Sequence, residues 1–143
     1  MELAILWRRM SLRLMTSRLV VDSYAWVEYL EGTDGGRKVK EALENKANEV
    51  YTCAVTIAEV VSKAVRAARD PESAYTAIVS NSHIIDVDDQ ISRSAGYEHA
   101  AQRRRLNDFG LADAYVLACA QKINGKTLTG DPHFANVPEA IMI

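Results

Sequence analysis

The 143-residue sequence has few cysteines and no long apolar run, and each shortage excludes a class of protein. Its two cysteines, Cys53 and Cys119, lie far apart in apolar segments. This pattern predicts buried, reduced thiols and excludes a disulfide-rich secreted domain. The longest apolar run near the N-terminus, residues 3–7, is too short for a signal sequence or a membrane span. We therefore expect a cytoplasmic protein without membrane contact.

An excess of charge of one sign is also missing. The chain has 17 Lys and Arg against 19 Asp and Glu, so its overall field does not attract nucleic acid, and any such binding needs local basic patches. Length and a 48% hydrophobic content predict one globular domain over residues 19–143. Residues 1–18 carry four arginines against Glu2 alone. We interpret them as a basic N-terminal extension, either disordered or upstream of the true start, with a nucleic-acid-binding arm as the alternative.

Short apolar strands alternate with amphipathic helices along the rest of the chain. The patterns predict strands at 19–21, 50–53, 83–87, 126–129 and 140–143, and helices over 24–30, 37–46, 56–69, 71–81, 88–105 and 111–122. This alternation predicts an α/β fold, a three-layer α/β/α sandwich with a central parallel sheet of four to five strands.

Four acidic residues are expected at one edge of that sheet. A helix that directly follows a strand starts at the sheet's carboxyl edge, and a helix that feeds the next parallel strand starts there too. This rule brings together Asp22, Glu59, Asp113 and Asp131. In open parallel sheets this edge is where ligands bind.

Each of the four also has a local explanation. Asp22 is a favoured helix cap, Glu59 would close a capping box with Thr56, Asp113 suits a helix N-terminus, and Asp131 opens a turn. Taken together, four carboxylates in one cleft repel each other unless a cation holds them, and Mg²⁺ or Mn²⁺ prefers such oxygen ligands. Further acidic residues, Asp86, Asp88 and Asp89, follow another strand and could line the same cleft.

The series Val21-Asp22-Ser23, Thr56-Ile57-Ala58-Glu59, Gly110-Leu111-Ala112-Asp113-Ala114 and Leu128-Thr129-Gly130-Asp131-Pro132-His133-Phe134 resembles the PIN domain. More closely, it resembles the VapC-type toxins of toxin–antitoxin pairs. The resemblance implies an endoribonuclease that uses Mg²⁺ or Mn²⁺ in this acidic quartet to activate water against RNA, usually tRNA or rRNA. It further implies Thr129 as a supporting polar residue, a cognate antitoxin as partner, and a homodimer.

The remaining residues leave two questions open. Lys63, Arg66 and Arg69 on one helix, and the Arg103–Arg105 run, either bind RNA phosphates beside the cleft or form ordinary solvated faces. His133 is expected to be an exposed turn residue, with contact to a substrate phosphate as the alternative. A phosphatase with a second aspartate two positions after Asp22 is disfavoured, because Tyr24 stands there. The rival of a different class is a non-catalytic PIN-like module whose acidic cleft binds a basic partner segment without metal.

Overall fold

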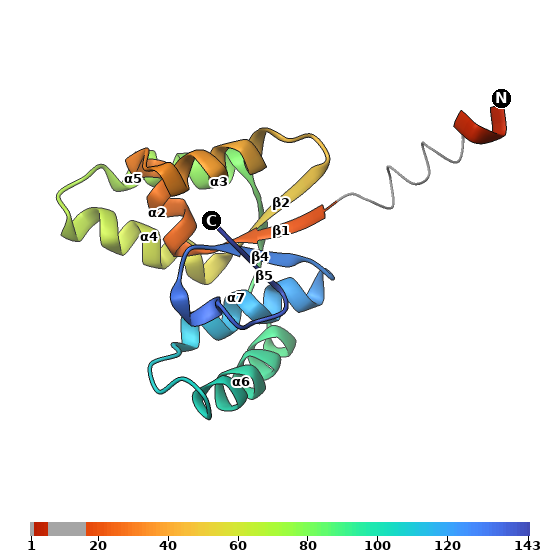
Figure 1. Cartoon of the computed structure of the whole chain (residues 1–143). Coiled ribbons are helices and arrows are strands. Elements are labelled where there is room, and N and C mark those ends of the chain that lie inside the picture. The colour runs from red at the N-terminus through yellow and green to blue at the C-terminus, as the bar shows by residue number, and fades with distance from the viewer. Residues whose placement is uncertain (1, 6–16) are drawn as a thin grey trace.

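The computed structural model describes residues 2–5 and 17–143. Within the second range, five parallel strands form one sheet in the spatial order β3-β2-β1-β4-β5. The strands are β1 (Ser17–Val21), β2 (Asn48–Cys53), β3 (His83–Ile85), β4 (Lys126–Thr129) and β5 (Ala140–Met142). Helices cover both faces of the sheet (Figure 1), so the predicted α/β/α sandwich is confirmed.

The helices divide unequally between the two faces (Figure 1). One side carries α2 (Ser23–Glu31), α3 (Asp34–Glu44), α4 (Ala54–Arg66) and α5 (Pro71–Asn81), and the other carries α6 (Asp89–Arg103) and α7 (Leu111–Lys122). A short 3₁₀ helix, η1 (Pro132–Phe134), follows β4.

The central strand β1 contributes to both hydrophobic cores. Consecutive side chains of a strand point to opposite faces. Val20 accordingly lies in the cluster with Phe109 and Leu117, while Val21 lies in the cluster with Trp26. Burial of each large apolar side chain of this kind contributes about 1.5–3 kcal/mol. The Trp26 indole also donates a hydrogen bond of 3.1 Å to the Thr52 hydroxyl, which fixes α2 against the sheet one turn after Asp22.

The connections place the predicted residues at the carboxyl edge of the sheet. Asp22 lies between β1 and α2, and η1 begins directly after Asp131. The helix α4 follows β2 without a loop, and α7 runs back from this edge to feed β4. Each predicted carboxylate therefore reaches the same end of the sheet.

Many element boundaries differ from the prediction by one to three residues. The helix α4 begins at Ala54, two residues before Thr56, and β3 ends at Ile85, two residues early. The strand β1 begins at Ser17, and Arg18 pairs with Glu49 of β2 at 3.2 Å, so the sheet includes the last two residues of the predicted extension. Residues 1 and 6–16 of that extension lie outside the described residues.

Two further expectations concern the thiols and the membrane. Both Cys53 and Cys119 are buried and free, as predicted. Among the described helices, none combines the length and the apolar character needed to cross a bilayer.

Candidate active site

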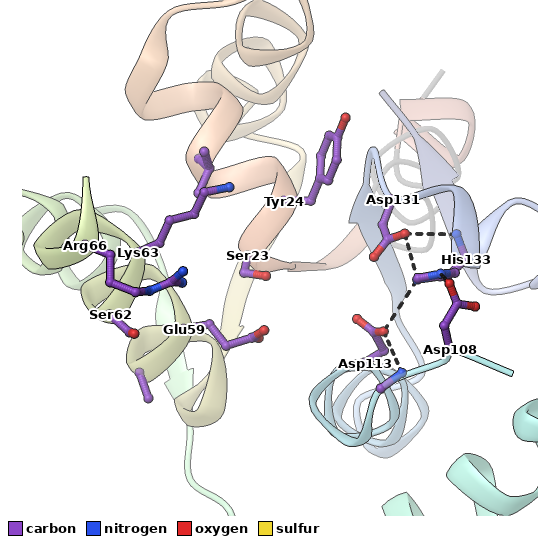
Figure 2. A pocket seen from close by; sticks show the side chains of 13 residues that line it. Ser23, Tyr24, Glu59, Ser62, Lys63, Arg66, Asp108, Asp113, Asp131 and His133 are labelled. Atoms are coloured by element: carbon purple, nitrogen blue, oxygen red, sulfur yellow. Dashed lines mark hydrogen bonds and ion pairs between the residues drawn. The ribbon is translucent and has the colours of Figure 1, made fainter. Parts of the chain in front are cut away.

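A pocket of about 620 Å³ opens at the carboxyl edge of the sheet, and its charged side chains lie on two sides (Figure 2). We call the side formed by Asp108, Asp113, Asp131 and His133 the acidic wall. Lys63 and Arg66 of α4 form the basic wall across the pocket. Glu59 extends from α4 into the space between them (Figure 2).

Asp22 is the most deeply buried carboxylate of the predicted set, with only 3% of the residue exposed. Its Oδ1 accepts a hydrogen bond of 2.8 Å from the Ala25 N–H, so it caps α2 as the local explanation predicted. Burial is the main cause that raises its pKa from 3.8 to about 7, against hydrogen bonds from Thr129 and Ala25 that lower the pKa. The charges of Asp131 and Asp113 raise the pKa further.

Asp113 and Asp131 are both half-buried, and each accepts a hydrogen bond from a backbone N–H. Asp113 lies in the first turn of α7, and its Oδ2 accepts the Gly110 N–H at 3.1 Å. Burial raises the pKa of Asp113, and the charge of Asp131 adds to this increase. Asp131 caps η1 by accepting the His133 N–H at 2.9 Å, and its own N–H donates to Thr129 Oγ1 at 2.9 Å. Thr129 therefore contacts the Asp22 carboxylate and the backbone of Asp131, and its supporting role stays a prediction.

Glu59 reaches the pocket from the second turn of α4, and the predicted capping box does not form. The residue at the helix N-cap is Cys53, which makes no side-chain cap. The buried hydroxyl of Thr56 has no hydrogen-bond partner among residues 2–5 and 17–143. Burial raises the pKa of Glu59, followed by the charge of Asp113, while a hydrogen bond from Ser23 lowers it. Since no capping role is left for Glu59, its place in the pocket is its distinguishing feature.

The contacts of His133, and any role for Asp108, are what sequence reasoning missed. His133 Nε2 lies 2.9 Å from Asp108 Oδ2, while Nδ1 lies 3.1 Å from Asp131 Oδ1 and 3.9 Å from Asp113 Oδ2. Only 28% of the His133 side chain is exposed, so the expected exposed turn residue is wrong. The hydrogen bond to Asp108 is the main cause that raises the pKa of His133. Proximity to Asp131 in sequence was the one available signal for His133, and Asp108 had none.

The alternative acidic residues do not line this pocket. Asp88 caps α6 through the Ile91 N–H at 2.8 Å and pairs with Lys122, at the far end of α7 from Asp113, at 3.5 Å. The basic residues divide in a similar way, because Lys63 and Arg66 line the pocket whereas Arg69 pairs with Glu31 at 3.8 Å. The Arg103–Arg105 run is not among the pocket-lining residues of the described chain.

Comparison with protein families gives a match over most of the chain. The model of the PIN domain family matches residues 19–140. The chain belongs to the PIN domain family. The predicted resemblance is thereby confirmed, and the match covers most of the sheet and all four predicted carboxylates. Among the curated proteins compared, none matches the sequence significantly.

Solved structures similar to this PIN domain include toxins of toxin–antitoxin pairs. The VapC20 toxin of Mycobacterium tuberculosis, described as sarcin–ricin loop cleaving, aligns with a TM-score of 0.71 at 15% identity over 87% of this chain and 98% of that chain. VapBC2 of Rickettsia felis, bound to promoter DNA, aligns with a TM-score of 0.68 at 15% identity over 88% of this chain and 97% of that chain. A toxin–antitoxin complex of Klebsiella pneumoniae aligns with a TM-score of 0.64 at 21% identity over 87% of this chain and 96% of that chain. At these identities, the structures establish a shared fold.

The donor set of this PIN domain fits a divalent cation. One ligand atom from each of Asp113, Asp131 and His133 lies within 4.8 Å of the others. His133 Nδ1 is buried and has no hydrogen-bond partner of good geometry among the described residues. Asp22 and Glu59 lie outside this compact group, although the charges of Asp113 and Asp131 act on both. Carboxylate oxygens suit Mg²⁺ and Mn²⁺, and an imidazole nitrogen is also a common ligand of transition metals.

Proposed function

We propose that this PIN domain is an endoribonuclease that depends on Mg²⁺ or Mn²⁺. One observation carries the proposal. Glu59, Asp113 and Asp131 line one pocket with Asp22 buried beside them, and within the described part of the chain none of the four forms an ion pair with lysine or arginine. Burial and mutual repulsion raise the pKa of Asp22, Glu59 and Asp113. A site that concentrates uncompensated negative charge is complementary to a bound cation.

The proposed roles follow from the position of each side chain. Asp113 and Asp131 supply half-buried carboxylates to the acidic wall, Asp22 lies buried beside them, and Glu59 faces them from α4. A bound divalent cation supplies a Lewis acid for phosphodiester hydrolysis. The Asp108 carboxylate holds the His133 ring through Nε2, which orients Nδ1 toward the acidic wall. Carboxylates that hold a ligating histidine in this way usually support metal affinity.

RNA is the substrate class that the rest of the pocket supports. Lys63 and Arg66 form no ion pair with another described residue, and they face the acidic wall across the pocket. Two positively charged side chains at this position suit the phosphates that flank a cleaved bond. The mycobacterial toxin of similar fold is described as sarcin–ricin loop cleaving, which supports the same substrate class. We propose structured RNA such as tRNA or rRNA as the target.

The direct experiment compares cleavage of a mixed pool of tRNA and rRNA by the purified chain with Mn²⁺ and with EDTA. We expect internal cleavage with Mn²⁺, and none with EDTA. Full cleavage in EDTA would exclude the metal mechanism. Absence of cleavage under both conditions, with retained binding of a basic peptide, would favour the non-catalytic module.

We further propose that the chain acts as the toxin of a pair and that its antitoxin directs an arginine into the acidic wall. A buried carboxylate cluster binds a guanidinium through charge-assisted hydrogen bonds, so one partner segment can occupy the place of the cation. The toxin–antitoxin complexes among the similar structures support such a partner. Gentle low-salt lysis of the native host should yield a complex with a small protein, and light scattering should then test the proposed homodimer. Recovery of the free chain alone would oppose the toxin–antitoxin assignment.

A further inference from the structure

Tyr24 is an exposed aromatic side chain at the pocket, and the proposed reaction gives it no role. It lies in the first turn of α2, two residues after Asp22, and lines the pocket. Its neighbours Ala25 and Trp26 are fully buried, whereas Tyr24 is 44% exposed. The Tyr24 side chain is therefore not part of the core that holds α2 on the sheet.

The Tyr24 ring packs against the backbone of Gly130, the residue before Asp131. A Cβ atom at position 130 would lie 2.5 Å from Tyr24 Cε1 and 2.7 Å from Cδ1. Only glycine leaves room for the ring at this distance. The contact holds the ring beside Asp131 (Figure 2) and leaves part of the residue exposed where it lines the pocket.

We propose that Tyr24 stacks on a base of the RNA substrate, beside the phosphodiester that the acidic wall receives. This inference rests on the proposed ribonuclease function and adds a specificity-determining residue to it. Unpaired bases in loops are commonly held on tyrosine and other aromatic rings, because every base presents a π face. No hydrogen bond joins the Tyr24 hydroxyl to another described residue, so the flat face of the ring is its available binding feature.

The basic wall favours RNA over a protein segment as the occupant. Lys63 and Arg66 line the same pocket as Tyr24, and their charges attract phosphates and repel a basic peptide. A single RNA strand can place one phosphate at the cation of the acidic wall and another at the basic wall. A base between these two phosphates can then stack on the Tyr24 ring. A basic partner segment would use only the acidic wall.

The experiment removes the ring from the protein and the base from the RNA, separately and together. Hairpin RNAs with a randomised loop are incubated with the wild-type chain and Mn²⁺, and the cleaved sequence is identified. The base on each side of the cleaved bond is then replaced by an abasic nucleotide. Steady-state kinetics are measured for the wild type and for Tyr24→Ala, Tyr24→Phe, Tyr24→Leu and Tyr75→Ala. Tyr75 is the matched control, because it is also 44% exposed but lies on α5, outside the pocket.

We expect Tyr24→Ala to raise KM by about 5- to 150-fold, the range that loss of one stacked base gives, with a smaller change in kcat. Tyr24→Phe should retain the wild-type KM, and Tyr75→Ala should do the same. Tyr24→Leu keeps an apolar contact on Gly130 without a π face, so it should resemble Tyr24→Ala. With the wild type, one of the abasic hairpins should raise KM as much as Tyr24→Ala raises it with the intact hairpin. When Tyr24→Ala is tested with that abasic hairpin, the two increases in KM should not multiply.

Several results would overturn the inference while leaving the nuclease intact. The first is an unchanged KM in both Tyr24→Ala and Tyr24→Leu. The second is a KM increase in Tyr24→Phe equal to that in Tyr24→Ala. The third is that the KM increases from the abasic hairpin and from Tyr24→Ala multiply in full. Weaker binding of a co-purified protein partner with unchanged RNA kinetics would assign Tyr24 to that partner instead. Absence of any RNA cleavage or binding by the wild type would reject the proposed function itself. If Tyr24→Ala does not fold, as circular dichroism would show, Tyr24→Leu decides between these results.

Discussion

The pocket and the surface outside it carry acidic side chains in opposite electrostatic settings. Outside the pocket, Glu49 lies 3.2 Å from Arg18, and Asp88 lies 3.5 Å from Lys122. The Ile91 N–H, with help from Lys122, lowers the pKa of Asp88, whereas burial raises the pKa of Asp22 beside the pocket. The fold pairs the two outer carboxylates with basic side chains and leaves those of the pocket without lysine or arginine partners among the described residues. The proposed function rests on this uncompensated charge at the pocket.

The largest expected difference between the two regions is in RNA cleavage. Asp113→Asn should reduce kcat by a factor of about 10³ or more, because it removes a proposed cation ligand while keeping the size of the side chain. Asp88→Asn makes the same chemical change outside the pocket and should leave kcat unchanged. Cleavage assays in Mn²⁺ with both variants test this contrast. Equal activity of the two variants would remove the functional distinction between the two regions.

The second difference is in how the stability of the metal-free protein depends on pH. The pKa of Asp22 is raised from 3.8 to about 7 in the folded state, so the folded state binds a proton more tightly than the unfolded state. The resulting stabilisation is complete below pH 3.8 and is lost as the pH rises through about 7, by up to about 4 kcal/mol. We expect the melting temperature in EDTA to fall by about 10 °C from pH 5 to pH 8.

Asp22→Asn provides the control for this pH dependence. Asparagine also caps a helix but does not ionise, so the melting temperature of the variant should vary much less over the same range. Asp88 behaves in the opposite direction, because its lowered pKa gives stability that is lost only as the pH falls below the ordinary range of aspartate. Parallel curves for the wild type and Asp22→Asn between pH 5 and pH 8 would mean that the burial of Asp22 has no electrostatic cost.

A smaller effect is expected from the basic wall. Lys63→Ala and Arg66→Ala should each weaken RNA binding. Each should also make the negative slope of log K against log salt shallower by about 0.7, the value for loss of one phosphate contact with a single strand. Arg69→Ala on the same helix is the control, because Arg69 pairs with Glu31 instead of lining the pocket. Affinity measurements at several salt concentrations would show this difference. A slope that changes equally in all three variants would indicate a general charge effect.

The sequence predicted the carboxyl-edge site well because the site depends on local order. A strand, its following residue and the next helix are consecutive, so hydrophobic periodicity placed Asp22, Asp113 and Asp131 at one edge. The resemblance to the PIN domain then selected them over the acidic residues that follow β3. The prediction was wrong where tertiary structure sets the boundary. Thr56 and Glu59 match a capping box, but β2 passes directly into α4 at Ala54 and leaves both residues inside the helix.

The contacts of His133 could not be predicted for a different reason. Asp108 lies in an irregular connection between α6 and α7, and its contact with His133 joins residues 25 positions apart. No periodic pattern specifies such a pair. Similarly, Lys63, Arg66 and Arg69 share one helix, and only the position of Glu31 on α2 determines which of them is paired.

Binding of Mn²⁺ to the metal-free protein tests the central claim most directly. Calorimetry should show binding to the wild type and to Asp88→Asn, and much weaker binding to Asp113→Asn. At about 100-fold excess over Kd, Mn²⁺ should stabilise the wild type by about 2.7 kcal/mol, which raises its melting temperature by several degrees. No Mn²⁺ binding by the wild type, with identical melting curves in EDTA and in Mn²⁺, would contradict the account and leave the four carboxylates as caps and turn residues only.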